Sequence, residues 1–120
     1  MSQKSVNIGA FKKDVGLDYD TLKELYMVFV DEIKSEKEVV NRHLALGEIG
    51  DLRKAIHNIK GIASSYRAPY IFEHARNLDV KLKLQDFNDI KSYVLDLNER
   101  IDDAVREINQ YFALAELSTE

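Results

Sequence analysis

Apolar residues recur every three to four positions through most of this chain, which is the spacing of one face of an α-helix. Residues 8 to 15 are predicted to form a short helix that ends near Gly16. A long helix follows, which Asp18 or Asp20 can cap at its start and Gly47 at its end. The apolar face of this second helix consists of Leu22, Leu25, Tyr26, Phe29, Val30, Ile33, Val40 and Leu44.

Three further helices are predicted in the second half of the chain. The third covers residues 51 to about 66, and Pro69 starts the fourth, where a missing N–H costs nothing. The inner side of the fourth helix consists of Ile71, Phe72, Ala75, Leu78 and Leu82. Asp86 and Asp89 resemble a capping arrangement for the last helix. Its apolar stripe consists of Phe87, Ile90, Val94, Leu97, Ile101, Val105, Ile108 and Phe112, and the phenylalanines on all these stripes are expected in the core.

Four long amphipathic helices with short connections favour an all-α fold, an antiparallel up-and-down four-helix bundle with a short extra N-terminal helix. No segment alternates with the two-residue period of a strand, so we expect no sheet. Residues 1–120 are expected to form a single domain with a core of about residues 8–115, because no linker, repeat or low-complexity stretch interrupts them. Four helices already close one core, so a monomer is expected.

Composition excludes several classes of protein. The chain has no cysteine, which excludes disulfides, thiol catalysis and a cysteine-based zinc site. The first residues carry no apolar signal-peptide core and no run approaches membrane-spanning length, so we expect a cytoplasmic protein without a membrane partner. A net charge of −4 argues against general nucleic-acid binding. The starting methionine favours a free-standing chain.

The charges are unevenly distributed along the sequence. Residues 52 to 72 contain no acid, although the chain holds 21 acidic residues. The basic residues of this stretch are Arg53, Lys54, Lys60 and Arg67. A local basic face on an acidic protein indicates an anionic ligand or an acidic partner surface there.

His57 stands in the middle of this basic stretch. At helical spacing Lys60 and Gly61 lie one turn after His57, and Arg53 and Lys54 lie one turn before it. Glycine inside a helix costs ~1 kcal/mol relative to alanine, so Gly61 indicates that something approaches the backbone there. A histidine with a neutral, nucleophilic nitrogen, beside a cleared position and bordered by cations, suits a phosphoryl group.

The connection between the third and fourth helices adds two neighbours. If these helices form a hairpin centred directly after Arg67, then His57 lies opposite Asp79, with Lys83 a turn further. We expect Asp79 to accept a hydrogen bond from Nδ1–H of His57, which would fix the tautomer that presents Nε2. Lys83 would then flank the phosphoryl group.

The motif His57-x-x-Lys60-Gly61, inside a helix, resembles the signature of histidine-containing phosphotransfer (HPt) domains. The resemblance extends over roughly residues 10 to 112 and includes the long preceding helix and the element lengths. The chain has Leu78-Asp79 where the family usually has Leu-Glu.

Two positions depart from the family pattern. Ile62 stands where a small residue is usual, and Arg67 stands where glycine is frequent.

The resemblance implies a phosphoryl carrier rather than an enzyme in the usual sense. Nε2 of His57 would take the group from a phospho-aspartate of a receiver domain and return it to another receiver. Lys60 would hold the phosphoryl oxygens, and Gly61 would let the partner's active site close over the histidine. The supporting residues of this predicted site are Asp79, Lys83, Arg53, Lys54 and Ser64.

The implied partners are receiver domains of response regulators or of hybrid histidine kinases. The partner would supply Mg²⁺, so we expect no bound cofactor. The chain has no glycine-rich nucleotide-binding motif, and therefore no phosphorylation from ATP is expected.

Other interpretations of the sequence stay open. The main alternative is a non-phosphorylated helical adaptor, including a degenerate HPt-like scaffold that binds receiver or kinase domains. A metal-carrying bundle is disfavoured, because the histidines are dispersed and no Glu-x-x-His pair exists; His43 and His74 are expected to be incidental. A histidine kinase dimerisation domain would need an ATP-binding domain after it. Gly61 could also simply relieve crowding between helices.

Overall fold

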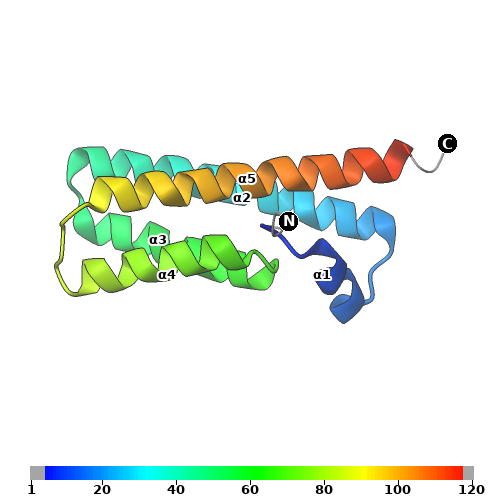
Figure 1. Ribbon diagram of the computed structural model, residues 1–120, viewed down its shortest axis with the longest axis horizontal. Coiled ribbons are helices and arrows are strands. Elements are labelled where there is room, and N and C mark those ends of the chain that lie inside the picture. Colours follow the sequence, from blue (N-terminus) through cyan, green and yellow to red (C-terminus); the bar gives the residue numbers. More distant parts are fainter. Residues whose placement is uncertain (1–4, 118–120) are drawn as a thin grey trace.

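The computed structural model describes residues 5–117, which contain five helices (Figure 1). They are α1 (Ile8–Val15), α2 (Tyr19–Leu46), α3 (Ile49–Ser65), α4 (Pro69–Lys83) and α5 (Ile90–Leu117). Residues 5–117 contain no strand, and the predicted all-α class is confirmed. Within these residues, no helix combines the length and hydropathy that a membrane crossing requires.

Helices α2 to α5 form the predicted antiparallel bundle. In this bundle α2 packs against α3, α3 against α4, α4 against α5, and α5 against α2. The 28-residue helices α2 and α5 run the length of the molecule, whereas α3 has 17 residues and α4 has 15. Figure 1 shows that α1 lies under the part of α2 and α5 that extends beyond the turn between α3 and α4. The short extra helix thus completes one end of the bundle.

Local sequence signals set most of the helix ends. The side chain of Asp18 accepts a hydrogen bond from the backbone N–H of Thr21 at 2.8 Å, so Asp18 is the cap of α2 rather than Asp20. Gly16 and Gly47 end α1 and α2 with φ of +70°, a left-handed conformation that glycine adopts without steric cost. Pro69 is the first residue of α4, as predicted.

The core lies between the four long helices and includes the buried aromatic rings of Tyr26, Phe29 and Phe112. Phe72 is half-buried at its edge. The prediction for Phe87 was wrong, because half of its surface is exposed. The reason is that α5 begins at Ile90, so Phe87 lies in the connection after α4 and not on the helical stripe.

The expected capping arrangement of Asp86 and Asp89 is not formed either. The carboxylate of Asp86 accepts hydrogen bonds from Nζ of Lys81 at 3.0 Å and from the backbone N–H of Asn88 at 3.2 Å. Asp89 has a φ of 59° and is the residue directly before α5. Asp86 therefore stabilises the connection after α4 and does not cap the last helix.

Arg67 occupies the turn between α3 and α4 in the left-handed conformation, with a φ of 60°. For a residue with a side chain this conformation costs roughly 1–2 kcal/mol. Its guanidinium lies 2.9 Å from a carboxylate oxygen of Asp14, and its carbonyl oxygen accepts a hydrogen bond from the N–H of Asn7 at 2.8 Å. The turn thus keeps a geometry suited to glycine, and Arg67 connects it to α1.

Candidate functional site

His57 lies near the middle of α3 with its imidazole exposed to solvent. Its neighbours Ile56 and Ile59 are fully buried, because they belong to the apolar face of α3. Asn58, Gly61 and Ser64 are exposed with His57. The amphipathic pattern of α3 therefore places the histidine on the outer surface of the bundle.

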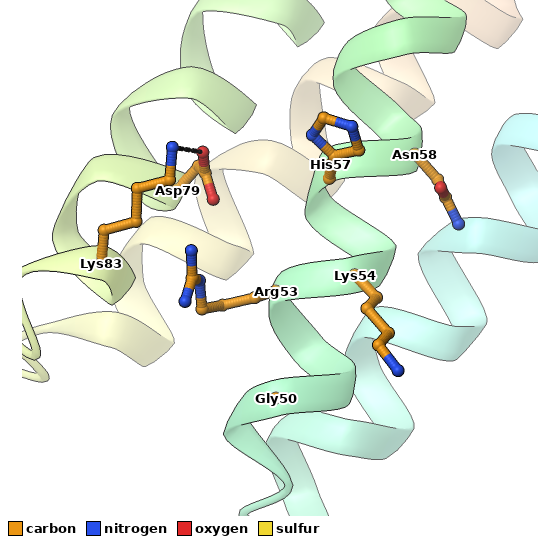
Figure 2. Close-up of a pocket in the computed structure, with 7 residues that line it drawn as sticks. All are labelled: Gly50, Arg53, Lys54, His57, Asn58, Asp79 and Lys83. Carbon is orange, nitrogen blue, oxygen red and sulfur yellow. Dashed lines mark ion pairs between the residues drawn. The ribbon is translucent and has the colours of Figure 1, made fainter.

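One side of the imidazole faces a hollow between α3 and α4, which we call the basic hollow (Figure 2). The residues that line it are Gly50, Arg53, Lys54, His57, Asn58, Asp79 and Lys83. Figure 2 shows the side chain of Arg53 extending from α3 toward α4, whereas Lys54 points away on the other side of α3. The helix hairpin brings His57, Asp79 and Lys83 together around one hollow.

Asp79 is buried at the edge of this hollow, with 4% of its surface exposed. One carboxylate oxygen, Oδ2, lies 3.2 Å from Nζ of Lys60 and 3.4 Å from Nζ of Lys83. Burial raises the pKa of Asp79, but the two ammonium groups outweigh it and leave this pKa below its usual range. Asp79 is therefore a buried, ionised carboxylate that is held by two lysines.

The expected hydrogen bond from His57 to Asp79 is not formed. Within residues 5–117, no hydrogen bond is made by the ring of His57, and the carboxylate of Asp79 pairs with Lys60 and Lys83. A carboxylate forms a stronger hydrogen bond with an ammonium group than with a neutral imidazole. The two lysines, and not His57, therefore pair with Asp79. The sequence indicated this competition for Asp79, because Lys60 lies one turn after His57 in α3 and Lys83 lies one turn after Asp79 in α4.

A second hollow lies on the other side of His57, between α2 and α3. The residues that line it are Glu32, Glu36, His57, Asn58, Gly61, Ile62, Ser65 and Tyr66. Because His57 and Asn58 line both hollows, the imidazole stands on the ridge between them. Sequence reasoning missed Asn58, Glu32 and Glu36, and for the two glutamates the missing information was how α2 packs against α3.

Gly61 lies one turn after His57 and is exposed. A Cβ atom built at this position would meet no heavy atom within 4 Å. Crowding between helices therefore does not explain the glycine, and that alternative is wrong. Gly61 leaves open surface beside the imidazole at a cost of ~1 kcal/mol relative to alanine.

The other predicted supporting residues lie at different distances from the imidazole. Arg53 is half-buried, and its Nε has no hydrogen-bond partner within the described part of the chain. Ser64 is exposed but lines a separate hollow with Asn7, Arg67 and Phe72, so the structure does not bring it to the hollows beside His57.

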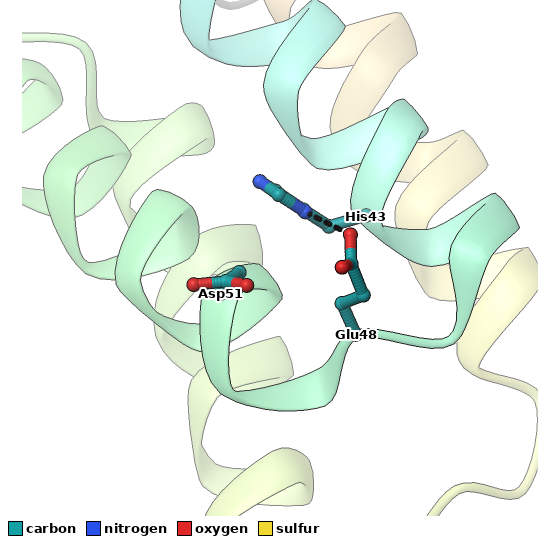
Figure 3. Close-up of side chains that lie close together, drawn as sticks. All are labelled: His43, Glu48 and Asp51. Carbon is teal, nitrogen blue, oxygen red and sulfur yellow. Dashed lines mark hydrogen bonds and ion pairs between the residues drawn. The ribbon is translucent and has the colours of Figure 1, made fainter.

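His43 and His74 lie away from the two hollows. Nδ1 of His74 is 2.9 Å from the carbonyl oxygen of Tyr70 in the first turn of α4. Nδ1 of His43 is 2.9 Å from Oε1 of Glu48, and Asp51 is close to both side chains (Figure 3). The candidate ligand atoms of these three residues lie within 4.8 Å of one another, and both acidic residues are exposed. This group links α2 to α3 across their turn, and sequence reasoning missed it because its members lie on both sides of a helix end.

Comparison with known proteins identifies the fold. No family model matches the chain, and no curated protein sequence matches it. Among solved structures, the chain has the fold of an HPT domain. The match is to the HPT domain from the Hpt sensor hybrid histidine kinase from Shewanella, with a TM-score of 0.77 and 14% sequence identity. It covers 92% of this chain and 95% of that chain.

Proposed function

We propose that this protein is a histidine phosphotransfer protein of a two-component phosphorelay. It accepts a phosphoryl group on His57 from the aspartate of a receiver domain and passes the group to another receiver. The observation that carries this proposal is the exposed imidazole on the ridge of α3, beside open surface at Gly61, in a fold shared with an HPT domain.

The transfer needs only one nucleophile from this chain. The lone pair of Nε2 attacks phosphorus, the P–N bond forms, and the P–O bond to the aspartate breaks as the carboxylate leaves with the electron pair. The proton stays on Nδ1. In the return step, a carboxylate of the second receiver attacks phosphorus, and the electrons of the P–N bond go back to Nε2.

The surroundings of His57 suit this reaction because phosphoryl transfer depends mainly on positioning and on charge stabilisation. The basic side chains of Arg53 and Lys83 line the basic hollow beside the imidazole. Gly61 leaves room for a receiver to approach the backbone of α3. In this proposal the receiver supplies the acidic residues and the Mg²⁺ ion, and this chain is a carrier without ATP-dependent activity.

A phosphotransfer assay with phosphorylated receiver domains tests the proposal. The wild type is expected to gain acid-labile, base-stable phosphate, and His57→Gln is expected to gain none. His43→Gln and His74→Gln are matched controls, since both histidines lie outside the two hollows, and both variants should accept phosphate like the wild type. Absence of transfer from a broad panel of receivers, with binding still detected, would favour the non-phosphorylated adaptor.

A further inference from the structure

Asp79 is the one charged residue that the fold buries within residues 5–117. It lies at the rim of the basic hollow together with His57, and it carries a negative charge at neutral pH. A phosphoryl group on His57 would add roughly two more negative charges to the same hollow. A fixed carboxylate at this position works against an anionic ligand, and the proposed transfer chemistry does not use it.

We propose that Asp79 is a positioning residue that holds the ammonium groups of Lys60 and Lys83 and thereby keeps the phosphohistidine at His57 easy to discharge. This inference rests on the proposed function. Without the negative charge of Asp79, both lysines would be available to the phosphoryl oxygens, and the phosphorylated state would be more stable.

The carboxylate of Asp79 is more deeply buried than the ammonium groups of Lys60 and Lys83, and it is therefore less free to move. The side chain of Asp79 is 6% exposed, whereas that of Lys60 is 22% exposed and that of Lys83 is 58% exposed. Lys83 is on the same helix at i+4, and Lys60 reaches Asp79 from α3. The lysines can therefore turn toward a new anion, but the negative charge of Asp79 stays in the hollow.

Among the described cations around the basic hollow, Arg53 differs from the two lysines that pair with Asp79. Lys54 points away from α4 (Figure 2), and the guanidinium of Arg53 is the cation that has no described ion pair and extends across the hollow. Arg53 can therefore contact a phosphoryl group without breaking an ion pair. Lys60 and Lys83 would have to share their charges between Asp79 and the phosphoryl oxygens.

The test is the equilibrium of phosphoryl transfer between a phosphorylated receiver and this protein, measured for the wild type and for Asp79→Asn. The substitution keeps the shape of the side chain and removes its charge. We expect the equilibrium constant to shift roughly 5- to 20-fold toward the phosphohistidine, and the transfer onward to a second receiver to slow. Asp79→Glu, which keeps the charge, should restore much of the wild-type equilibrium.

Asp86→Asn is the matched control, because Asp86 also pairs with a lysine of α4 but does not line the basic hollow. Its equilibrium constant should equal that of the wild type. An equilibrium for folded Asp79→Asn within twofold of the wild type, or shifted toward the receiver, would overturn the inference. A wild type that accepts no phosphate from any receiver would instead overturn the proposed function.

A second variant keeps the test decisive if Asp79→Asn does not fold. Lys83 has a largely exposed side chain, so Lys83→Gln should fold normally. It removes one cation and leaves the charge of Asp79, and the equilibrium should therefore shift roughly 3- to 10-fold toward the receiver. An unchanged equilibrium for Lys83→Gln would also contradict the inference.

Discussion

The hydroxyl of Tyr26 donates a hydrogen bond to the backbone carbonyl oxygen of Tyr66 at 2.8 Å. Tyr26 is fully buried in α2, and Tyr66 is the residue that follows α3. The last carbonyl groups of a helix lack partners within that helix, so a buried hydroxyl is a suitable donor. This hydrogen bond attaches the end of the helix that carries His57 to the N-terminal third of α2, and aromatic contacts from Phe11 and Phe29 surround it.

Tyr26→Phe is expected to lower the free energy of unfolding by roughly 1–3 kcal/mol at pH 7, because it leaves the partly buried carbonyl oxygen of Tyr66 without this donor. Urea unfolding measures the change. Tyr70→Phe is the control, since the hydroxyl of Tyr70 makes no hydrogen bond among the described residues. Equal stability of the two variants would contradict the structural role of Tyr26.

The same tyrosine should make stability depend on alkaline pH. Burial raises the pKa of Tyr26 above its ordinary value. A group whose pKa is raised by folding contributes stability that is complete below its unfolded pKa of ~10 and is lost as the pH rises through its folded pKa. The wild type should therefore lose more stability than Tyr26→Phe between pH 9 and pH 11. Unfolding curves at both pH values would show this difference, and parallel losses would contradict it.

Arg67 allows a prediction about backbone strain. Arg67→Val should lower the free energy of unfolding by about 1–2 kcal/mol, because a β-branched residue is poorly compatible with a φ of 60°. Arg67→Gly should change it by less than ~1 kcal/mol, since glycine relieves the strain but makes the unfolded chain more flexible. Thermal unfolding measures both values.

Asp14→Asn is the control for the ion pair that Arg67 makes. Both partners are about half exposed, so removal of the pair should change stability by only ~0–1 kcal/mol. Equal stability of Arg67→Val and Arg67→Gly would show that the left-handed backbone conformation at position 67 is not strained.

Much of the fold could be predicted from the sequence, because the helices carry regular apolar stripes and recognisable ends. Asp18, Gly47 and Pro69 mark helix ends through local chemistry, which requires no knowledge of the tertiary structure. Phe87 shows where such reasoning fails. It continues the spacing of the last stripe, but the backbone between Lys83 and Ile90 is not helical, so the ring lies at the surface.

The candidate site was less predictable than the fold. Helix spacing placed His57 opposite Asp79, and both residues line the basic hollow. The partners of Asp79 depend on side-chain directions and on competition between Lys60, Lys83 and the imidazole, which spacing alone does not resolve. The hollow between α2 and α3 depends on the packing of two helices, so the sequence pattern carried no signal for it.

The buried carboxylate of Asp79 should make stability depend on acidic pH. The pKa of Asp79 is lower in the folded protein than in the unfolded chain. Its contribution is therefore complete above the unfolded pKa of ~3.9 and is lost as the pH falls through the folded pKa. At pH 7, Asp79→Asn should be less stable than the wild type by roughly 1–3 kcal/mol.

This difference between the wild type and Asp79→Asn should shrink when unfolding is measured near pH 2. Asp31→Asn is the control, because Asp31 is exposed and makes no ion pair among the described residues. It should leave the acidic pH dependence unchanged. A gap between Asp79→Asn and the wild type that is equally large at both pH values would contradict the role of the carboxylate charge.

Gly61→Ala distinguishes a role of Gly61 in the stability of the fold from a role in the approach of a partner. No heavy atom lies within 4 Å of a Cβ atom at this position, so the methyl group causes no clash within the protein. Alanine is also the better helix former, and the free energy of unfolding should rise by about 0.5–1 kcal/mol. Phosphoryl uptake should nevertheless fall roughly tenfold or more, since misplacement of reacting groups by about 1 Å can slow a reaction 100-fold.

Gly9→Ala is the matched control, because Gly9 is a helical glycine with equally open space in α1, away from the hollows beside His57. It should leave the rate of uptake unchanged. Chemical unfolding and the rate of uptake from a phosphorylated receiver, measured on the same preparations, give both quantities. A Gly61→Ala variant that is more stable and less active places the reason for the glycine in the complex with the partner. If the variant is equally active, a receiver does not approach α3 at Gly61, and the surface that faces the partner must lie elsewhere around His57.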